Sequence, residues 1–179
     1  NEFQNESLIH FIHGKKKNII GIKKVNMVGH SLGNTSIMYY LLQAAHNPNL
    51  PRLNKQVSIG GHFDGLDFKQ LPIAIRQPAN LRVDNEGKPN KMNATYREMA
   101  KLRTLYPNKE IDVLNIIGNI GGNSDGIVKN ASSLSLEYLV APMAKSYRVV
   151  TITGKNAEHG QLTYNKQVEK QIINFLWLQ

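Results

Sequence analysis

The sequence predicts an α/β fold with a mostly parallel sheet and helices on both of its faces. Short apolar runs of strand type alternate with amphipathic helical segments, the order expected of β-α-β units. A serine flanked by glycines lies between the first buried strand and the helix that follows it. The chain has 179 residues, of which 41% are hydrophobic and 20% charged, as in ordinary globular domains. We therefore expect residues 1–179 to belong to a single domain, with no disulfide or metal needed for its core.

The first third of the chain contains two predicted helices and two predicted strands. Apolar residues at near-helical spacing predict a helix over residues 5–17. The apolar run at 25–28 predicts a short buried strand that ends at Gly29, and one apolar face predicts a helix over 32–46. A second apolar run predicts a strand at 56–59, closed by two glycines.

Residues 62–92 have no clear hydrophobic period. They contain three prolines and several Asn, Asp and Gly residues, and they are too long for a simple connection in a compact domain. Long irregular segments of this kind often carry function, so we expect a lid or a pocket-forming insertion here.

The rest of the chain returns to alternation. Periodic apolar residues predict helices over 93–105 and, more briefly, over 132–139. The run at 111–117 is the most strand-like in the chain, and 147–153 is rich in β-branched residues, which favour strands. An amphipathic pattern predicts a final helix over 164–178.

Composition excludes several classes of protein. The chain has no cysteine, so disulfides, thiolate metal sites and a cysteine nucleophile are ruled out. Its net charge is +9, but the basic residues are not interleaved with aromatic ones, and we do not expect a nucleic-acid partner. A weak attraction to anionic cell-surface material is the more plausible consequence of this charge. The loop at 118–126 lacks the spacing of a calcium loop, and the sequence implies no metal or organic cofactor.

The strongest motif is Gly29-His30-Ser31-Leu32-Gly33. It stands between a buried strand and an amphipathic helix, the context of a nucleophile elbow. In such an elbow the serine occupies a sharp, strained turn, and we expect both glycines to let strand and helix approach closely. Ser31 is the predicted nucleophile, and the backbone N–H of Leu32 at the helix start is the predicted oxyanion donor.

A serine nucleophile needs a histidine base, which we expect to be His159. This residue follows the last predicted strand, where the base of such a site belongs in chain order. His62, after the second strand, is the alternative base, or else a pocket residue. His30 lies within the elbow, and we expect it to point away from the serine and to be a pocket candidate.

The base in turn needs an acid to orient it, which we expect to be Asp125. It follows the strand at 111–117 in a glycine-rich loop that can turn a carboxylate back toward the cleft. Asp64, after the second strand, is the main competitor. Glu158 adjoins His159 but would need an improbable turn to orient its ring.

Near the start of the chain, His13 and Gly14 resemble the His-Gly pair that donates a second oxyanion N–H in lipases. Only 17 positions separate Gly14 from Ser31, too few for the intervening elements of such a fold. We therefore expect this pair to end the first helix.

Three runs together resemble a known family. G-H-S-L-G-N at 29–34, N-S-D-G-I-V at 123–128 and A-E-H-G-Q-L at 157–162 are similar to the DUF915 group of α/β-hydrolases from Gram-positive bacteria. Members of this group are often labelled cell-surface hydrolases or lipase/esterase-like proteins. The resemblance covers nearly the whole chain and implies an α/β-hydrolase fold, an extracytoplasmic or cell-surface location, and a triad at Ser31, Asp125 and His159.

In that family, an N-terminal stretch with the first strands and a His-Gly oxyanion loop precedes the first helix. This chain does not begin with Met, and no apolar run in it approaches the ~18 residues of a membrane span. We expect it to be the C-terminal portion of the domain, without those strands. Loss of one oxyanion donor would lower the rate about 10²–10³-fold.

The predicted function is hydrolysis of an ester, carboxylesterase- or lipase-like, through a Ser-His-Asp triad and an acyl-enzyme. The expected substrate is a small-molecule or lipid-like ester. Two alternatives are an acyltransferase with the same triad and a non-catalytic hydrolase-like module that binds the cell surface.

Overall fold

The computed structural model describes residues 22–178. The helix predicted over 5–17, with His13 and Gly14, lies outside the described residues. Within residues 22–178, four strands form one sheet in the order β1-β2-β3-β4, and each neighbouring pair is parallel. The strands are β1 (Lys24–His30), β2 (Arg52–Ile59), β3 (Ile111–Asn119) and β4 (Ala144–Thr153). Sheet order thus equals chain order, and the carboxyl ends of all four strands meet at one edge of the sheet.

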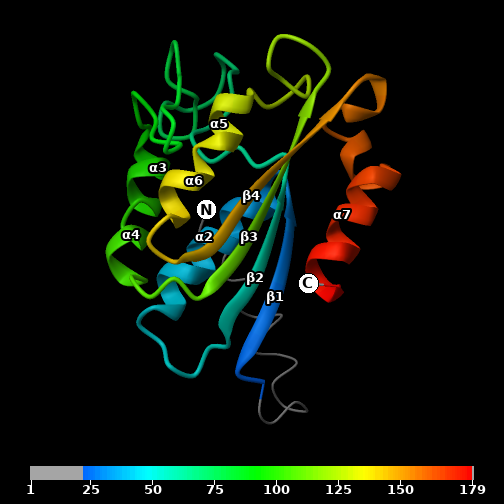
Figure 1. Ribbon diagram of the computed structural model, residues 1–179. Helices are drawn as coiled ribbons and strands as arrows, with labels where there is room; N and C mark the ends of the chain where they lie inside the picture. Colours follow the sequence, from blue (N-terminus) through cyan, green and yellow to red (C-terminus); the bar gives the residue numbers. More distant parts are fainter. Residues whose placement is uncertain (1–21, 179) are drawn as a thin grey trace.

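Helices cover both faces of the sheet, as the α/β alternation predicts (Figure 1). One face carries α2 (Leu32–Ala44), α3 (Ala94–Met99), α4 (Leu102–Leu105), α5 (Asn130–Leu134) and α6 (Leu136–Val140). The other face carries α7 (Lys166–Trp177), which follows two 3-10 turns, η2 (Lys155–Ala157) and η3 (Gln161–Tyr164).

Each face of the sheet has its own apolar core. Val113 of β3 packs into the larger cluster with residues of α2, α3, α4 and α6. Its neighbour Leu114 packs into the smaller cluster with Val168 and Phe175 of α7. This alternation is the two-residue period of a strand that is buried on both sides.

Two predicted helices each proved to be a pair. The segment 93–105 contains α3 and α4, and α3 begins after Asn93, whose side chain accepts a hydrogen bond from the Tyr96 N–H at 2.8 Å. The segment 132–139 corresponds to α5 and α6, with Ser135 between them. The strand predicted at 56–59 starts earlier, at Arg52, because the more polar residues before Gln56 continue the pairing with β1.

Residues 62–92 contain no helix and no ladder strand, as predicted, yet backbone hydrogen bonds order them. The N–H of Leu66 donates to the Ile75 carbonyl at 3.4 Å, and the N–H of Gln77 donates to the Leu66 carbonyl at 2.9 Å. Of the helices between residues 22 and 178, none is long and apolar enough to cross a membrane.

Candidate active site

Ser31 occupies the sharp turn between β1 and α2, with φ 51° and ψ −121°. A residue other than glycine in such a conformation typically costs about 1–3 kcal/mol and persists only where its surroundings hold it. The Ser31 N–H donates to the Ile59 carbonyl at the end of β2 (3.0 Å). The buried Asn34 amide donates to the carbonyls of Ser31 (3.1 Å) and Ile59 (3.2 Å). The end of β2 and the first turn of α2 therefore hold the strained serine in place.

The two glycines around Ser31 differ in what they permit. A Cβ on Gly29 would lie 2.9 Å from the backbone nitrogen of Asn34 and 2.9 Å from Cδ1 of Ile37. A Cβ on Gly33 would meet nothing within 4 Å among the described residues. Among the described residues, the close approach of strand and helix therefore depends on glycine at Gly29, and no such contact is present at Gly33.

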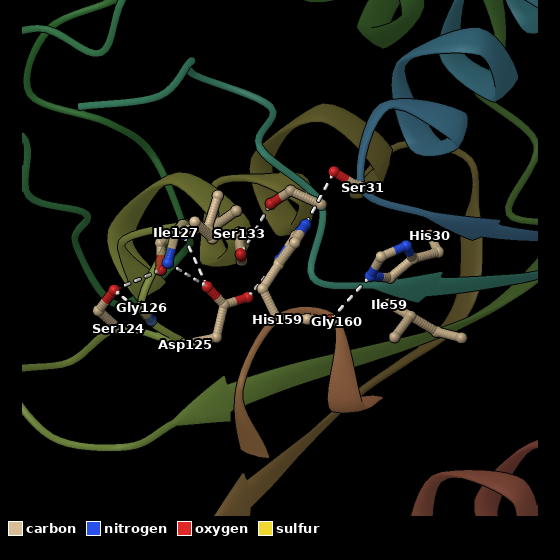
Figure 2. Close-up of polar contacts among 12 residues, drawn as sticks. His30, Ser31, Ile59, Ser124, Asp125, Gly126, Ile127, Ser133, His159 and Gly160 are labelled. Carbon is tan, nitrogen blue, oxygen red and sulfur yellow. Dashed lines mark hydrogen bonds and ion pairs between the residues drawn. The ribbon is translucent and has the colours of Figure 1, made fainter. Parts of the chain in front are cut away.

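The structure brings Ser31, His159 and Asp125 together from three loops that follow β1, β4 and β3 (Figure 2). Nε2 of His159 lies 2.9 Å from Oγ of Ser31, and Nδ1 of His159 lies 2.7 Å from Oδ2 of Asp125. A carboxylate only accepts, so Nδ1–H donates to Asp125 and Nε2 is left to accept the Ser31 hydroxyl proton. The rival residues His62 and Asp64 do not hold these positions.

Backbone donors fix the carboxylate of Asp125. Its Oδ1 accepts hydrogen bonds from the N–H groups of Ile127 (3.0 Å) and Val128 (2.7 Å), and its side chain is only 2% exposed. Burial raises the pKa of Asp125, but hydrogen bonds from His159, Val128 and Ile127 outweigh it, and the pKa lies below the ordinary value. The carboxylate is therefore ionised at neutral pH and can stabilise a positive imidazole.

The Asp125 and His159 loops are also joined through their backbones. The His159 N–H donates to the Asp125 carbonyl at 2.9 Å. Gly118, at the end of β3, permits this approach, because a Cβ there would lie 2.2 Å from the Ala157 carbonyl oxygen. Gly60, with φ +52°, lies against the same pair, and its Cβ would be 3.1 Å from Nδ1 of His159. The sequence signalled Gly60 only as the end of a strand.

His30 contacts the base from the opposite side to Asp125 (Figure 2). Its Nε2–H donates to the carbonyl of His159 at 3.0 Å, and the two rings are 4.7 Å apart between centroids. Burial lowers the pKa of His30, so its imidazole is neutral at neutral pH. As a pocket candidate it lines a groove with Val28 and Trp177, between β1 and α7.

The competing acid, Asp64, has a different set of contacts. Its Oδ1 accepts the Asn93 N–H at 2.9 Å, and its own N–H donates to Oγ of Ser132 at 3.1 Å. Burial raises the pKa of Asp64 to about 7, against the lowering effect of the Asn93 hydrogen bond and the Arg97 charge. Asp64 thus connects the start of the 62–92 segment to Asn93, the residue directly after its end, and to Ser132 of α5.

His62 and Leu32 lie at a cavity of about 200 Å³ beside the elbow. Burial lowers the pKa of His62, so it too is neutral near pH 7. Leu32 is the first residue of α2, and its N–H is among the four at a helix start that have no acceptor within the helix. This N–H and the positive end of the helix dipole are positioned to stabilise an anion next to Ser31.

The family model described as "Alpha/beta hydrolase of unknown function (DUF915)" matches residues 6–179. The chain belongs to the DUF915 family. No curated protein matches this DUF915 chain significantly.

Solved structures share the fold of this DUF915 chain. The product of the gene lin2722 from Listeria innocua matches with a TM-score of 0.78 at 24% identity, over 98% of this chain. A "putative cell surface hydrolase" from Lactobacillus plantarum WCFS1 matches with 0.72 at 19% identity, over 99%. The carboxylesterase CesB from Bacillus subtilis matches with 0.53 at 13%, over 98%. The chain spans 66%, 63% and 66% of these three proteins, and at such identities the likeness shows the fold alone.

Proposed function

We propose that this DUF915 protein is a serine hydrolase that cleaves esters through an acyl-enzyme on Ser31. The observation that carries the proposal is the continuous hydrogen-bond chain from Oγ of Ser31 through His159 to Asp125, at 2.9 and 2.7 Å. Positive φ at Ser31 supports it, because strained backbone of this kind clusters at catalytic sites. The fold supports it further, since α/β-hydrolases carry their nucleophile on this strand-to-helix turn.

The chemistry follows from the positions of these atoms. Nε2 of His159 takes the hydroxyl proton as Oγ of Ser31 bonds to the ester carbonyl carbon, and the carbonyl oxygen becomes an oxyanion. The Leu32 N–H and the start of α2 stabilise that oxyanion. The imidazolium then gives its proton to the departing alkoxide, leaving an acyl group on Ser31 and a free alcohol. Water attacks the acyl group by the same route and restores the serine.

Asp125 and His30 support this cycle without touching the substrate. Ionised Asp125 holds the Nδ1–H tautomer and stabilises the imidazolium, and its low pKa keeps it ionised. The His30 N–H on the His159 carbonyl restrains the backbone of the base.

Two names among the structural neighbours support the substrate class and the location. One neighbour is a carboxylesterase and another is named as a cell surface hydrolase. We therefore place an ester as substrate and the cell surface as location within this proposal, and the net charge of +9 is compatible with an anionic envelope.

A fluorophosphonate probe tests the proposal, because it reacts covalently with an activated serine. We expect the purified wild-type protein to be labelled at Ser31, as located by peptide mass analysis. Ser31→Ala should abolish labelling. Ser36→Ala, in the helix α2 that follows Ser31, should leave labelling intact. Absence of labelling in the wild type, or equal labelling of Ser31→Ala, would refute the proposed function.

A further inference from the structure

The cavity beside the elbow has a mostly apolar wall. Its volume is about 200 Å³. Its apolar lining comes from Leu32 at the elbow and from Phe63, Leu66, Leu71 and Ile75 of the 62–92 segment. Phe63 is buried and Leu66, Leu71 and Ile75 are half-buried, so the side chains that form the cavity are themselves packed.

The backbone of the 62–92 segment fixes the wall of this cavity. The Leu66 N–H and Ile75 carbonyl are paired, and so are the Gln77 N–H and Leu66 carbonyl. Gly65, with φ +88°, allows the chain around Leu66 to approach the chain around Ile75, because a Cβ on Gly65 would lie 2.5 Å from the Ile75 carbonyl oxygen. The cavity is therefore largely pre-formed and does not depend on closure around a ligand.

The cavity adjoins the elbow through His62 and through Leu32, the residue after Ser31, while Ser31 itself does not line it. The alcohol oxygen leaves as His159 protonates it, so the alcohol part of an ester lies against that imidazole. His159 and Asp125 do not line the cavity either, whereas Leu32, whose N–H is the proposed oxyanion donor, does. The carbon chain attached to the carbonyl can then extend away from the imidazole, into the apolar space.

Resting on the proposed function, we propose that this cavity is an acyl pocket that selects esters of short, unbranched fatty acids of about four to six carbons. A water molecule needs only about 10–15 Å³ of such space, so a cavity of about 200 Å³ has room for a chain of several groups of that size. A methylene group is comparable in size, and the mouth of the cavity leaves some of that volume to solvent. Sites that enclose whole drug-sized ligands are larger, at roughly 300–1,000 Å³. The cavity therefore fits one short chain, and longer acyl chains extend beyond its wall.

Ile75 and Ile73 offer a matched pair for the test. Both are isoleucines on the same segment, but Ile75 lines the cavity and Ile73 is 77% exposed. Ile75→Ala removes carbon atoms from the wall, and each extra methylene that then finds room raises kcat/KM about fourfold. We expect Ile75→Ala to move the optimum of a nitrophenyl ester series, from about two to about twelve acyl carbons, to chains longer by about two carbons. Ile73→Ala should keep the wild-type optimum.

Four further measurements keep the outcome decisive. Leu71→Ala should cause the same shift as Ile75→Ala, and thermal unfolding shows whether each variant folds. The rates for a series of acetate esters with alcohols of increasing length should follow the same order in the wild type and in all three variants. Fluorophosphonate labelling of Ser31 reports on the catalytic machinery independently of chain length.

The results separate the two proposals. A move of the optimal acyl length to longer chains in Ile75→Ala and Leu71→Ala, but not in Ile73→Ala, supports the acyl pocket. Normal labelling with an unchanged acyl optimum in both cavity variants overturns the pocket and leaves the proposed function standing, and so does a shift that follows the alcohol chain. If the wild-type protein shows neither fluorophosphonate labelling nor ester cleavage, the proposed function is overturned, and the acyl pocket with it.

Discussion

Replacing Asp125 with Asn tests the proposed role of the acid, because it exchanges one carboxylate oxygen for an NH₂ group. Oδ1 of Asp125 accepts two backbone N–H groups, from Ile127 and Val128. The amide oxygen of Asn must take that position, because an NH₂ group there would face two donors. The NH₂ group is then left facing Nδ1 of His159, where the carboxylate oxygen accepted a hydrogen bond at 2.7 Å.

The consequence is the wrong histidine tautomer. Nδ1 becomes an acceptor, the ring proton moves to Nε2, and the nitrogen 2.9 Å from Oγ of Ser31 can no longer take its proton. In triads of this kind the change lowers kcat about 10⁴-fold without disturbing the geometry. We expect a loss of about 10³–10⁴-fold in kcat for a short nitrophenyl ester, slower fluorophosphonate labelling, and a nearly unchanged unfolding curve.

Asp64→Asn is the matched control. Asp64 is also buried and also accepts a backbone N–H, at 2.9 Å from Asn93, but it has no contact with the imidazole. We expect this variant to retain kcat within a few-fold of wild type. Activity of Asp125→Asn within about tenfold of wild type, or a larger loss in Asp64→Asn, would refute the assignment of the acid.

Two further predictions follow from the elbow and from Asp64. Gly29→Ala forces a Cβ to within 2.9 Å of Asn34, so it should lose about 1–3 kcal/mol of unfolding free energy in urea and most Ser31 labelling. Gly33→Ala meets nothing among the described residues and should gain about 0.5 kcal/mol; equal losses at the two positions would contradict the steric argument. Burial raises the pKa of Asp64 from 3.8 to about 7, so the folded state retains a proton that the unfolded state releases above about pH 4. The free energy of unfolding should therefore fall by about 1–4 kcal/mol between about pH 4 and 7, and Asp64→Asn should remove this fall. If the unfolding free energies of the wild type and Asp64→Asn differ by the same amount at every pH, the prediction is contradicted.

Much of the fold could be predicted because its signals are local. The apolar runs that became β1 and β3, and the periodic segments that became α2 and α7, each report a buried face through spacing alone. The start of β2 was missed because its polar first residues are held by pairing with β1, which sequence patterning does not reveal. The break between α3 and α4 was missed because apolar residues at helical spacing continue across it.

The steric roles of the glycines could not be predicted from the motif. Gly29 and Gly33 are equivalent in a G-x-S-x-G pattern, but among the described residues an added Cβ meets α2 at Gly29 and meets nothing at Gly33. Gly60 belongs to no motif, yet its missing side chain leaves room for the imidazole of His159 and the carboxylate of Asp125. Close approach between segments distant in sequence depends on tertiary packing.

The sequence by itself determined that Ser31 stands on a strand-to-helix turn and that a histidine and two carboxylates follow later strands. Turn, strand and helix signals each depend on a few neighbouring residues, so they can be read without a fold. Only the tertiary structure decided which carboxylate meets the imidazole. Asp64 and Asp125 are both buried and both follow a strand, but the loop after β3 lies beside the loop after β4, and two backbone N–H groups orient Asp125 toward His159. A hydrogen bond between residues 34 positions apart forms where the sheet order brings their loops together, and chain spacing does not encode that order.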